Sequence, residues 1–338
     1  MKLRFITVLF ILTSNATFSQ RGCASMNLYN KALETDPNFR FNRNLMMRER
    51  EAINLNSRVV LETTINVVVH VLWKENAQKV SRETVLSQIE VLNQDFNASN
   101  SDVKNVPATF KAFVGNPRVK FKLTDKDPAG KPHSGVISKQ TELDVFLEDH
   151  DMKFSAKGGD DAWPRDRFLN IWVCNLGPDE NGDQLLGHAQ FPGGPESTDG
   201  VVIWFNAFGA NGRAPAPFDR GRTATHEVGH WFNLFHIWGN DGLPSCTDTD
   251  EVEDTPNQER QNVGRQTTFP HISCDNQPNG DMFMNYMDYV DDAAMFMFSK
   301  GQADRIKSTI ATLRRAGSIK YTQTGINKIY FLEEIREY

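Results

Sequence analysis

The sequence predicts an α/β fold, and three observations support this prediction. Apolar, β-branched segments at residues 64–71, 119–123, 169–174 and 201–205 are typical of buried strands. Apolar residues recur at helical spacing between residues 81 and 96. After residue 239 comes a stretch of about fifty residues that is dense in Asp, Asn, Pro and Gly, a length unusual for a loop without a function or a cross-link. With 338 residues, the chain can form one large domain, or two lobes around a cleft.

The N-terminus has the pattern of a secretory signal. Residues 1–4 are basic, residues 5–12 are apolar, and small or polar residues follow to residue 20. We expect residues 1–19 to be a signal peptide with cleavage within residues 16–20, because the apolar run is too short to span a membrane. No later apolar run reaches membrane-spanning length, so the mature protein is expected to be secreted and without a membrane span.

The remaining elements follow in order. Residues 20–57 are rich in Arg, Asn and Glu, and we expect a helical segment that lies on another part of the chain. A helix entered through Ser81 would bury one face, formed by Val85, Ile89, Leu92 and Phe96. A last helix begins at Ser299, where Gln302 completes a capping box. Residues 319–338 are expected to be a loosely attached tail.

Charge argues against one class of partner, and the cysteine count sets the number of possible disulfide pairings. The net charge is −6 with a pI near 5.8, and no long basic block is present, which argues against nucleic acid as a partner. The four cysteines are Cys23, Cys174, Cys246 and Cys274, and three pairings are open in an oxidising compartment. Cys174 lies in an apolar strand segment, so we interpret it as a buried thiol.

Residues 226–236 read HEVGHWFNLFH and predict a metal site. His226 and His230 are four residues apart, so on a helix both imidazoles leave one face and form half a zinc site. Glu227 stands where a carboxylate can take a proton from a water activated by the metal. His236 can join them only if the chain turns sharply after residue 232, and Asn233 tolerates the left-handed conformation needed there. Three histidines leave a fourth position for water, which indicates a peptide-bond hydrolase.

With these motifs, the chain resembles the pappalysin family of metzincin peptidases over residues 21–318. The resemblance rests on the segments VVVHV (67–71), LNIWV (169–173), HEVGHWFNLFH (226–236), DTP (254–256) and NYMDY (285–289). It implies a two-lobed metzincin fold with a catalytic domain at residues 58–318. The upper lobe would hold a twisted, mostly parallel sheet and the active-site helix, and the lower lobe would be rich in loops and end in the last helix. A substrate would pair with the sheet edge, for which residues 200–205 are our choice.

The resemblance also implies roles for single residues. Met287 would form the Met-turn beneath the metal, and the Tyr289 hydroxyl would bind the oxyanion, although packing alone is the alternative for Tyr289. Arg21 to Ala24 resembles a short inhibitory motif in which Cys23 binds the zinc of the latent enzyme, so residues 20–57 would be a prosegment. A lipoprotein cysteine and a structural disulfide are the alternatives for Cys23. Ala24 stands where the family has glycine, and Cys246 would pair with Cys274.

Two acidic segments receive roles in the same way. Asp250, Val252 and Thr255 would bind calcium, the alternative being an acidic loop exposed to solvent. Asp292, or its neighbour Asp291, would lie at the base of the S1′ pocket and select Arg or Lys after the scissile bond, the alternative being a surface pair. Cleavage between Ser57 and Arg58 would then be self-processing, because it places Arg at P1′.

We therefore predict a secreted zinc endopeptidase that acts on proteins or peptides and is made as a zymogen. Two alternatives stay open. One is a binding protein on the same scaffold whose zinc site is structural and closed by Cys23. The other is a metzincin of another branch, without a preference for basic residues. The sequence does not indicate an oligomeric state.

Overall fold

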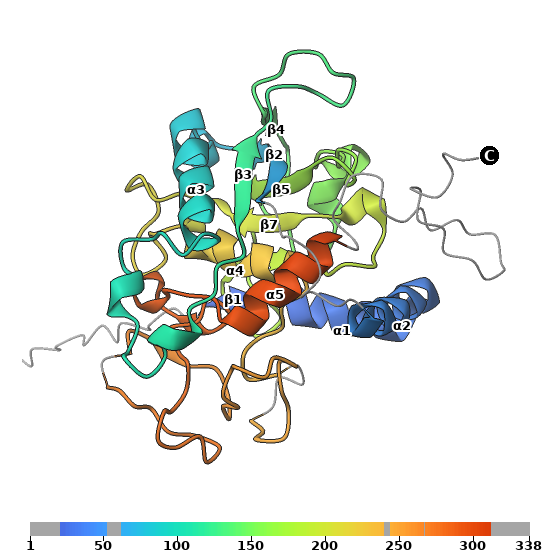
Figure 1. Cartoon of the computed structure of the whole chain (residues 1–338). Helices are drawn as coiled ribbons and strands as arrows, with labels where there is room; N and C mark the ends of the chain where they lie inside the picture. The colour runs from blue at the N-terminus through green and yellow to red at the C-terminus, as the bar shows by residue number, and fades with distance from the viewer. Residues whose placement is uncertain (1–20, 53–61, 240–243, 267, 312–338) are drawn as a thin grey trace, which may run out of the picture.

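A computed structural model describes residues 21–52, 62–239, 244–266 and 268–311, and its centre is a seven-stranded sheet (Figure 1). The strand order is β1-β6-β7-β5-β2-β3, and β4 also pairs with β2. All pairs are parallel except β6 with β7, so the predicted mostly parallel α/β sheet is confirmed. The strands are β1 (Gly22–Cys23), β2 (Thr63–Trp73), β3 (Val119–Leu123), β4 (Val136–Gln140), β5 (Leu169–Cys174), β6 (Leu185–Ala189) and β7 (Val201–Trp204).

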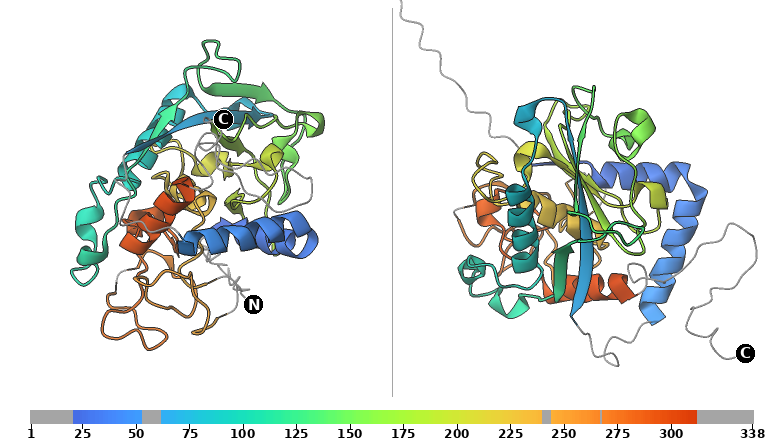
Figure 2. Two further views of the ribbon diagram at one scale, coloured as in Figure 1. Left: turned by 45° about the vertical axis from the view of Figure 1, so that its right-hand side comes forward. Right: turned by 90° about the horizontal axis from the view of Figure 1, so that it is seen from above.

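Five α-helices surround the sheet within the described residues: α1 (Ser25–Thr35), α2 (Pro37–Ala52), α3 (Arg82–Asp95), α4 (Arg222–Trp231) and α5 (Lys300–Thr309). Two begin as the sequence predicts. The Ser81 hydroxyl caps α3 by accepting a hydrogen bond from the Thr84 amide, and Ser299 and Gln302 form the capping box of α5. Helices α1 and α2 lie together at one side of the molecule, as the segment before residue 57 was expected to do (Figures 1 and 2).

The sheet buries both of its faces. On one face, α3 and α4 pack on the inward side chains of β2 and β5, and this core continues without a break to Met287 and Phe298 of the lower lobe. On the other face, Trp172 and the free thiol of Cys174 pack under the loop that contains Phe146 and Met152. Cys174 is fully buried, as predicted.

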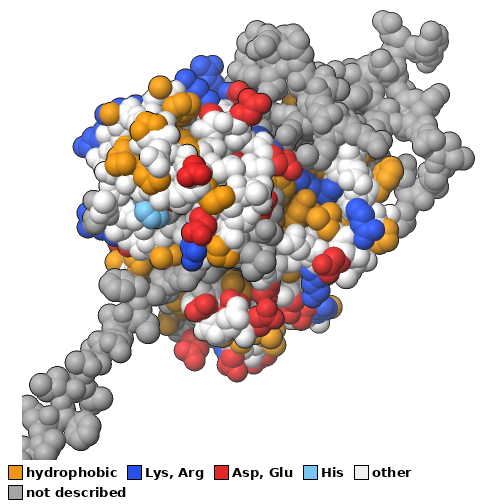
Figure 3. All heavy atoms as spheres, turned by 90° about the horizontal axis from the view of Figure 1, so that it is seen from below, with side chains coloured by type: hydrophobic (Ala, Val, Ile, Leu, Met, Phe, Trp, Pro, Cys, Tyr) orange, Lys and Arg blue, Asp and Glu red, His pale blue; other side chains and the backbone are white. Residues whose placement is uncertain are grey.

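The lower lobe consists mainly of loops. It holds the two-stranded sheet of β8 (Val263–Gly264) and β9 (Tyr289–Val290), and the chain continues from there to α5, which is labelled in Figure 1. The disulfide between Cys246 and Cys274, implied by the family resemblance, is confirmed. Acidic and basic side chains intermingle on the face seen from below (Figure 3). Within the described residues, no helix combines the length and apolar character needed to cross a membrane.

One prediction about the sheet is wrong. Residues 200–205 were expected to form its edge, but β7 lies between β5 and β6. The strand beyond it, β6, has the sequence LLGHA, which is short and lacks the β-branched residues that indicate strands. Strand β1 pairs with the outer side of β6, so the N-terminal segment covers the true edge. The predicted signal peptide, the Ser57–Arg58 cleavage site and the tail at 319–338 lie outside the described residues.

Candidate active site

The histidine motif forms one compact cluster. Helix α4 carries His226 and His230 and ends at Trp231, and Asn233 then turns the chain with a φ of 74°, the left-handed conformation predicted for it. The turn brings His236 back beside the helix. The Nε2 atom of His230 lies 3.1 Å from Nε2 of His226 and 3.1 Å from Nε2 of His236.

Hydrogen bonds on the far side of the rings determine which nitrogens carry protons. Nδ1 of His226 lies 2.7 Å from the Tyr286 carbonyl, and Nδ1 of His230 lies 2.8 Å from the Leu234 carbonyl. A carbonyl only accepts, so each Nδ1 carries the proton and each Nε2 presents a lone pair. Burial lowers the pKa of His230 to about 4, which keeps its ring neutral. Facing lone pairs 3.1 Å apart repel each other unless a cation lies between them, so this donor set fits a metal ion.

Cys23 of the N-terminal segment completes the cluster. Its Sγ lies 3.5 Å from His230 Nε2, and the four donor atoms all lie within 4.8 Å of one another. Four donors around one zinc ion, with bonds of about 2.0–2.3 Å, are about 3.3–3.8 Å apart. Without a cation, burial and then the nearby Glu227 raise the pKa of the Cys23 thiol well above its usual 9.0. A metal would stabilise the thiolate instead.

Glu227 is buried beside the cluster and is also covered by the N-terminal segment. Its Oε2 accepts a hydrogen bond of 2.7 Å from the hydroxyl of Ser25, and that hydroxyl accepts a 2.8 Å bond from the Ala189 amide of β6. Burial raises the pKa of the Glu227 carboxyl to about 7. Gly187 leaves room for this carboxylate, because a Cβ there would lie 3.0 Å from Glu227 Cγ. The sequence gives no indication of this role for Ser25, since a serine near a cysteine carries no signal of its own.

The two residues assigned to the Met-turn region lie beneath and beside the cluster. The Met287 sulfur packs so closely under α4 that a Cβ at Gly229 would lie 2.5 Å from it. The Tyr289 ring packs edge-on against His236, with centroids 4.9 Å apart, and its hydroxyl lies 3.5 Å from the Cys23 carbonyl. Tyr289 therefore packs against the core and also contacts the N-terminal segment with its hydroxyl.

Of the two aspartates considered for specificity, Asp292 is the one that binds a side chain of the N-terminal segment. It is fully buried and forms an ion pair of 2.5 Å with Arg21, whose guanidinium also lies 5.0 Å from the centre of the Phe218 ring. The second oxygen of Asp292 accepts from the backbone amides of Arg220 and Arg222, at the start of α4. Asp291 is only half-buried.

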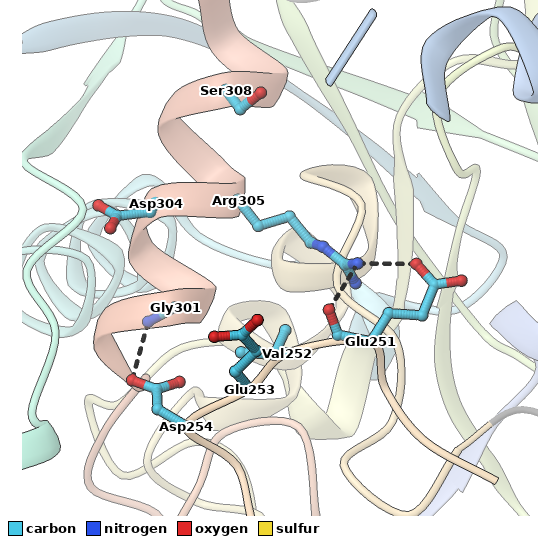
Figure 4. A pocket seen from close by; sticks show the side chains of 8 residues that line it. All are labelled: Glu251, Val252, Glu253, Asp254, Gly301, Asp304, Arg305 and Ser308. Atoms are coloured by element: carbon cyan, nitrogen blue, oxygen red, sulfur yellow. Dashed lines mark hydrogen bonds and ion pairs between the residues drawn. The ribbon is translucent and has the colours of Figure 1, made fainter. Parts of the chain in front are cut away.

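The residues assigned to calcium converge in the lower lobe. One oxygen of Asp250 accepts from the Val252 amide and from the Thr255 hydroxyl, which also lies 2.7 Å from the Val252 carbonyl. The other oxygen, Oδ2, is buried and has no hydrogen-bond partner among the described residues. Burial raises the pKa of Asp250 to about 7. The loop that follows lines a pocket against α5, where Arg305 binds the carbonyl and carboxylate of Glu251 (Figure 4).

A buried polar network that the sequence analysis missed holds α4 in place. Arg222, the first residue of α4, donates to the Tyr286 hydroxyl, which donates to Asp95 of α3. Thr225 donates to the other Asp95 oxygen, and burial raises the pKa of Asp95 to about 6. The network joins α3, α4 and the segment that carries Met287, so it fixes where the histidines lie. Its members are far apart in the sequence, so no local motif could reveal it.

Comparisons with known proteins agree with this geometry. The model of the family described as pregnancy-associated plasma protein-A (Peptidase_M43) matches residues 153–311. An extracellular metalloprotease of Arthroderma gypseum is 30% identical over 300 residues, which cover 87% of this chain and 85% of that protein. Mature mirolysin of Tannerella forsythia with a cleaved peptide is 48% identical with a TM-score of 0.70, over 73% of this chain and 91% of that one.

A mutant of the precursor, promirolysin of Tannerella forsythia, covers more of the chain. It is 44% identical with a TM-score of 0.77, over 86% of this chain and 94% of that one. The added coverage accords with an N-terminal segment that a zymogen retains and a mature enzyme lacks. The expected metzincin fold is thus confirmed, and the chain belongs to the Peptidase_M43, or pappalysin, family of zinc metalloendopeptidases.

Proposed function

We propose that this protein is a secreted zinc endopeptidase that cleaves before Arg or Lys and is held latent by residues 20–57. The observation that carries the proposal is the convergence of three neutral histidines and Cys23 on one point beside a buried glutamate. Secretion is supported by the N-terminal sequence and by the similar fungal proteins, which are named extracellular.

His226, His230 and His236 would hold the zinc ion, with Cys23 as the fourth ligand in the latent protein. Zinc, when bound, supplies a Lewis acid that polarises the scissile carbonyl and lowers the pKa of water. The backbone carbonyls behind His226 and His230 fix the two rings in the orientation that a metal needs. Met287 supports the site from below by packing against Gly229.

Glu227 would act as the general base and then as the acid. Its carboxyl lies at the edge of the donor cluster, 3.6 Å from Cys23 Sγ, where it can first accept a proton and later donate it. The proton it takes from the attacking water would pass to the leaving amine. The Tyr289 hydroxyl reaches the same space and would donate a hydrogen bond to the oxyanion.

The preference for a basic P1′ residue is supported by Arg21, which occupies the pocket in the latent chain as a substrate arginine would. Arg21 is 2% exposed, and its guanidinium lies between the Asp292 carboxylate and the face of Phe218. A buried carboxylate selects strongly for a cation, because any other occupant leaves its charge unpaired. We therefore assign S1′ selectivity to Asp292 rather than Asp291.

Latency would follow from three residues at alternate positions. Arg21 fills the Asp292 pocket, Cys23 takes the metal position that water needs, and Ser25 binds the general base. Gly22 lets β1 approach β6, since a Cβ there would lie 2.5 Å from the Gln184 carbonyl oxygen. Ala24 has a φ of −93° and packs in the core, so the family's glycine is not needed at that position. Cleavage between Ser57 and Arg58 would release the whole prosegment and leave the catalytic domain, residues 58–318.

We also propose a structural calcium ion at Asp250, Val252 and Thr255. A buried carboxylate oxygen without a hydrogen bond is costly, and a hard cation would satisfy it together with the nearby carbonyl and hydroxyl oxygens. The ion would order the loop that continues to Asp254. The Asp254 carboxylate accepts hydrogen bonds from the Ser299 hydroxyl and the Gly301 amide at the start of α5.

Mass spectrometry of the purified full-length protein, incubated with zinc and calcium beside a Glu227→Ala control, tests the central proposal. We expect the wild type to yield a chain that begins at Arg58, and the control to stay intact. Chelation should stop the reaction, and added zinc should restore it. If both proteins stay intact with zinc bound and neither cuts an arginine-containing peptide, the binding protein with a closed zinc site becomes the better interpretation.

Specificity is tested on the mature enzyme with two matched variants, Asp292→Asn and Asp291→Asn. Asparagine keeps an oxygen for the amides of Arg220 and Arg222 but removes the negative charge. The ratio of kcat/KM for P1′ Arg over P1′ Ala should fall by about a hundredfold or more in Asp292→Asn, the scale for breaking a buried charge pair. Asp291→Asn should leave the ratio near that of the wild type. Equal effects of the two variants would contradict the assignment.

A further inference from the structure

The path of the N-terminal segment gives the cleft two ends. Gly22 pairs with Leu185, Cys23 pairs with Gly187, and the Ser25 hydroxyl binds the Ala189 amide, so the segment follows β6 from its start to its end. Arg21 lies before this path, in the Asp292 pocket, and Met26 lies beyond it. The metal donors are between the two. The path of the segment therefore continues past the metal donors, away from Asp292.

Two aromatic rings form the wall at this second end. Phe191 follows β6 by two residues, and Phe235 directly precedes His236. The two rings are stacked with their centroids 5.3 Å apart and an interplanar angle of 28°, and the Phe191 ring lies 5.2 Å from that of His230. The pair is thus continuous with both the edge strand and the metal site.

The N-terminal segment alone supplies the apolar cover of this pair. Within the described residues, Phe191 and Phe235 form a core cluster whose other members are Met26, Tyr29, Ala32, Leu33 and Phe39, all from α1 and α2. Both rings are almost fully buried, at 2% and 3% exposed. Outside the N-terminal segment, the Arg305 guanidinium of α5 lies 5.7 Å from the centre of the Phe235 ring. Loss of residues 20–57 would therefore uncover apolar surface of two adjoining aromatic rings beside the metal donors, where an apolar surface can bind a ligand.

We propose that Phe191 and Phe235 form an apolar subsite on the non-primed side of the scissile bond, and that it binds a large apolar side chain of the substrate. The assignment rests on the proposed function, because Asp292 defines the primed side. The Tyr29 ring covers the subsite in the latent chain, with its centroid 4.7 Å from that of Phe191 and 5.6 Å from that of Phe235, and Met26 packs in the same cluster. Arg21 occupies the pocket at the other end in the same way. A peptide paired with β6 sends every second side chain to one side, so one non-primed residue can reach the rings while the P1′ residue reaches Asp292.

The test uses the mature enzyme and peptides with P1′ Arg fixed and each of the three residues before the scissile bond varied among Ala, Met, Tyr and Asp. We expect Met or Tyr at one of these positions to raise kcat/KM over Ala by roughly 10- to 100-fold, as apolar pockets do. Phe191→Ala should abolish most of this preference and leave the P1′ Arg over Ala ratio unchanged. Phe113→Ala, a substitution of a partly exposed phenylalanine outside the cleft, is the matched control.

Two further measurements keep the outcome decisive. Phe191→Leu keeps an apolar core if the alanine variant is poorly folded, and it should reduce the preference in part. Met26→Ala in the zymogen should speed release of the prosegment, because it removes one side chain from the cluster. Cleavage at Arg with a flat non-primed profile, or a preference that both Phe191 variants leave intact, would overturn the subsite while the proposed function stands. Failure to cut any Arg peptide would overturn both.

Discussion

Substitution of Ser25 by alanine should weaken latency without touching the mature enzyme. Ser25 is fully buried, and its hydroxyl joins the Glu227 carboxylate to the Ala189 amide of the edge strand. Alanine fits the same space but leaves both partners without this hydrogen bond while the prosegment is in place. In the open state water can reach both groups. The substitution therefore raises the free energy of the closed state relative to the open one.

The size of the effect follows from the kind of hydrogen bond. A bond to a charged group contributes about 1.5–3 kcal/mol, whereas a neutral pair contributes about 0.5–1.5 kcal/mol. With a tenfold change for every 1.4 kcal/mol, the bond to Glu227 alone corresponds to a shift of about 10- to 150-fold toward the open state. Arg21 and Cys23 still hold the segment, so Ser25→Ala should leave most molecules closed.

The assay needs a zymogen that cannot process itself. Arg58→Ala should provide one by removing the basic P1′ residue of the proposed cleavage site, and mass spectrometry verifies that the chain stays intact. The remaining activity on a P1′ Arg peptide then measures the fraction of open molecules. In this background, Ser25→Ala should raise the remaining activity by the factor given above. Thr35→Ala, which removes an exposed hydroxyl of the same segment, is the control.

The reasoning is refuted if Ser25→Ala raises the activity of the intact zymogen no more than Thr35→Ala does. A second control is part of the design. Zymogens with and without the Ser25 substitution, each with Arg58 restored, would mature to the same polypeptide, so their mature activities must be equal. A difference there would point to misfolding during maturation and not to the hydrogen bond.

Three other predictions concern separate contacts. Gly22→Ala should raise the activity of the intact zymogen in the same assay, because its Cβ would meet the Gln184 carbonyl oxygen at 2.5 Å; unchanged activity would show that β1 can shift freely. Replacing both Cys246 and Cys274 by serine should lower the free energy of unfolding, measured in urea, by about 3–4 kcal/mol. This is the loop-closure entropy expected for a disulfide between residues 28 positions apart. The buried ring of His188, whose pKa burial lowers well below 6.5, stays neutral while the unfolded chain gains a proton below pH 6.5. The contribution of His188 to stability should therefore fall by about 1.7 kcal/mol from pH 6.5 to 5, and His188→Leu should remove this part of the slope.

Local signals account for the parts of this fold that the sequence predicts well. The spacing of His226 and His230, the bend at Asn233 and the caps of α3 and α5 depend on residues within one or two turns of each other. The same holds for β2, where a run of valines indicates burial on both faces. Only the family resemblance relates the histidine motif of residues 226–236 to distant segments, such as the one that carries Met287.

The parts that were missed depend on pairing between distant segments. Strand β6 has no β-branched residue and becomes a strand because β7 and β1 provide its partners. The sequence therefore favours β7 as the edge of the sheet, although β6 lies outside it. In the same way, Ser25 has its role only because β1 brings it to the Glu227 carboxylate, 202 residues away in the chain. Neither feature has a period or motif that a single sequence could reveal.

If residues 20–57 form an inhibitory prosegment as proposed, the direction of β1 would explain how this segment can fill the substrate site and remain uncut. Strand β1 runs parallel to β6, from the Asp292 pocket toward Phe191. A substrate with Arg at P1′ in the Asp292 pocket must place its N-terminal part at the Phe191 end, so it runs antiparallel to β6. The proposed prosegment would therefore use the same side-chain pockets as a substrate, with its backbone reversed. Its amide groups then do not present a scissile bond to Glu227 in the orientation that catalysis needs. Binding strength and resistance to cleavage are in this way independent, and tight latency requires no departure from the substrate preference.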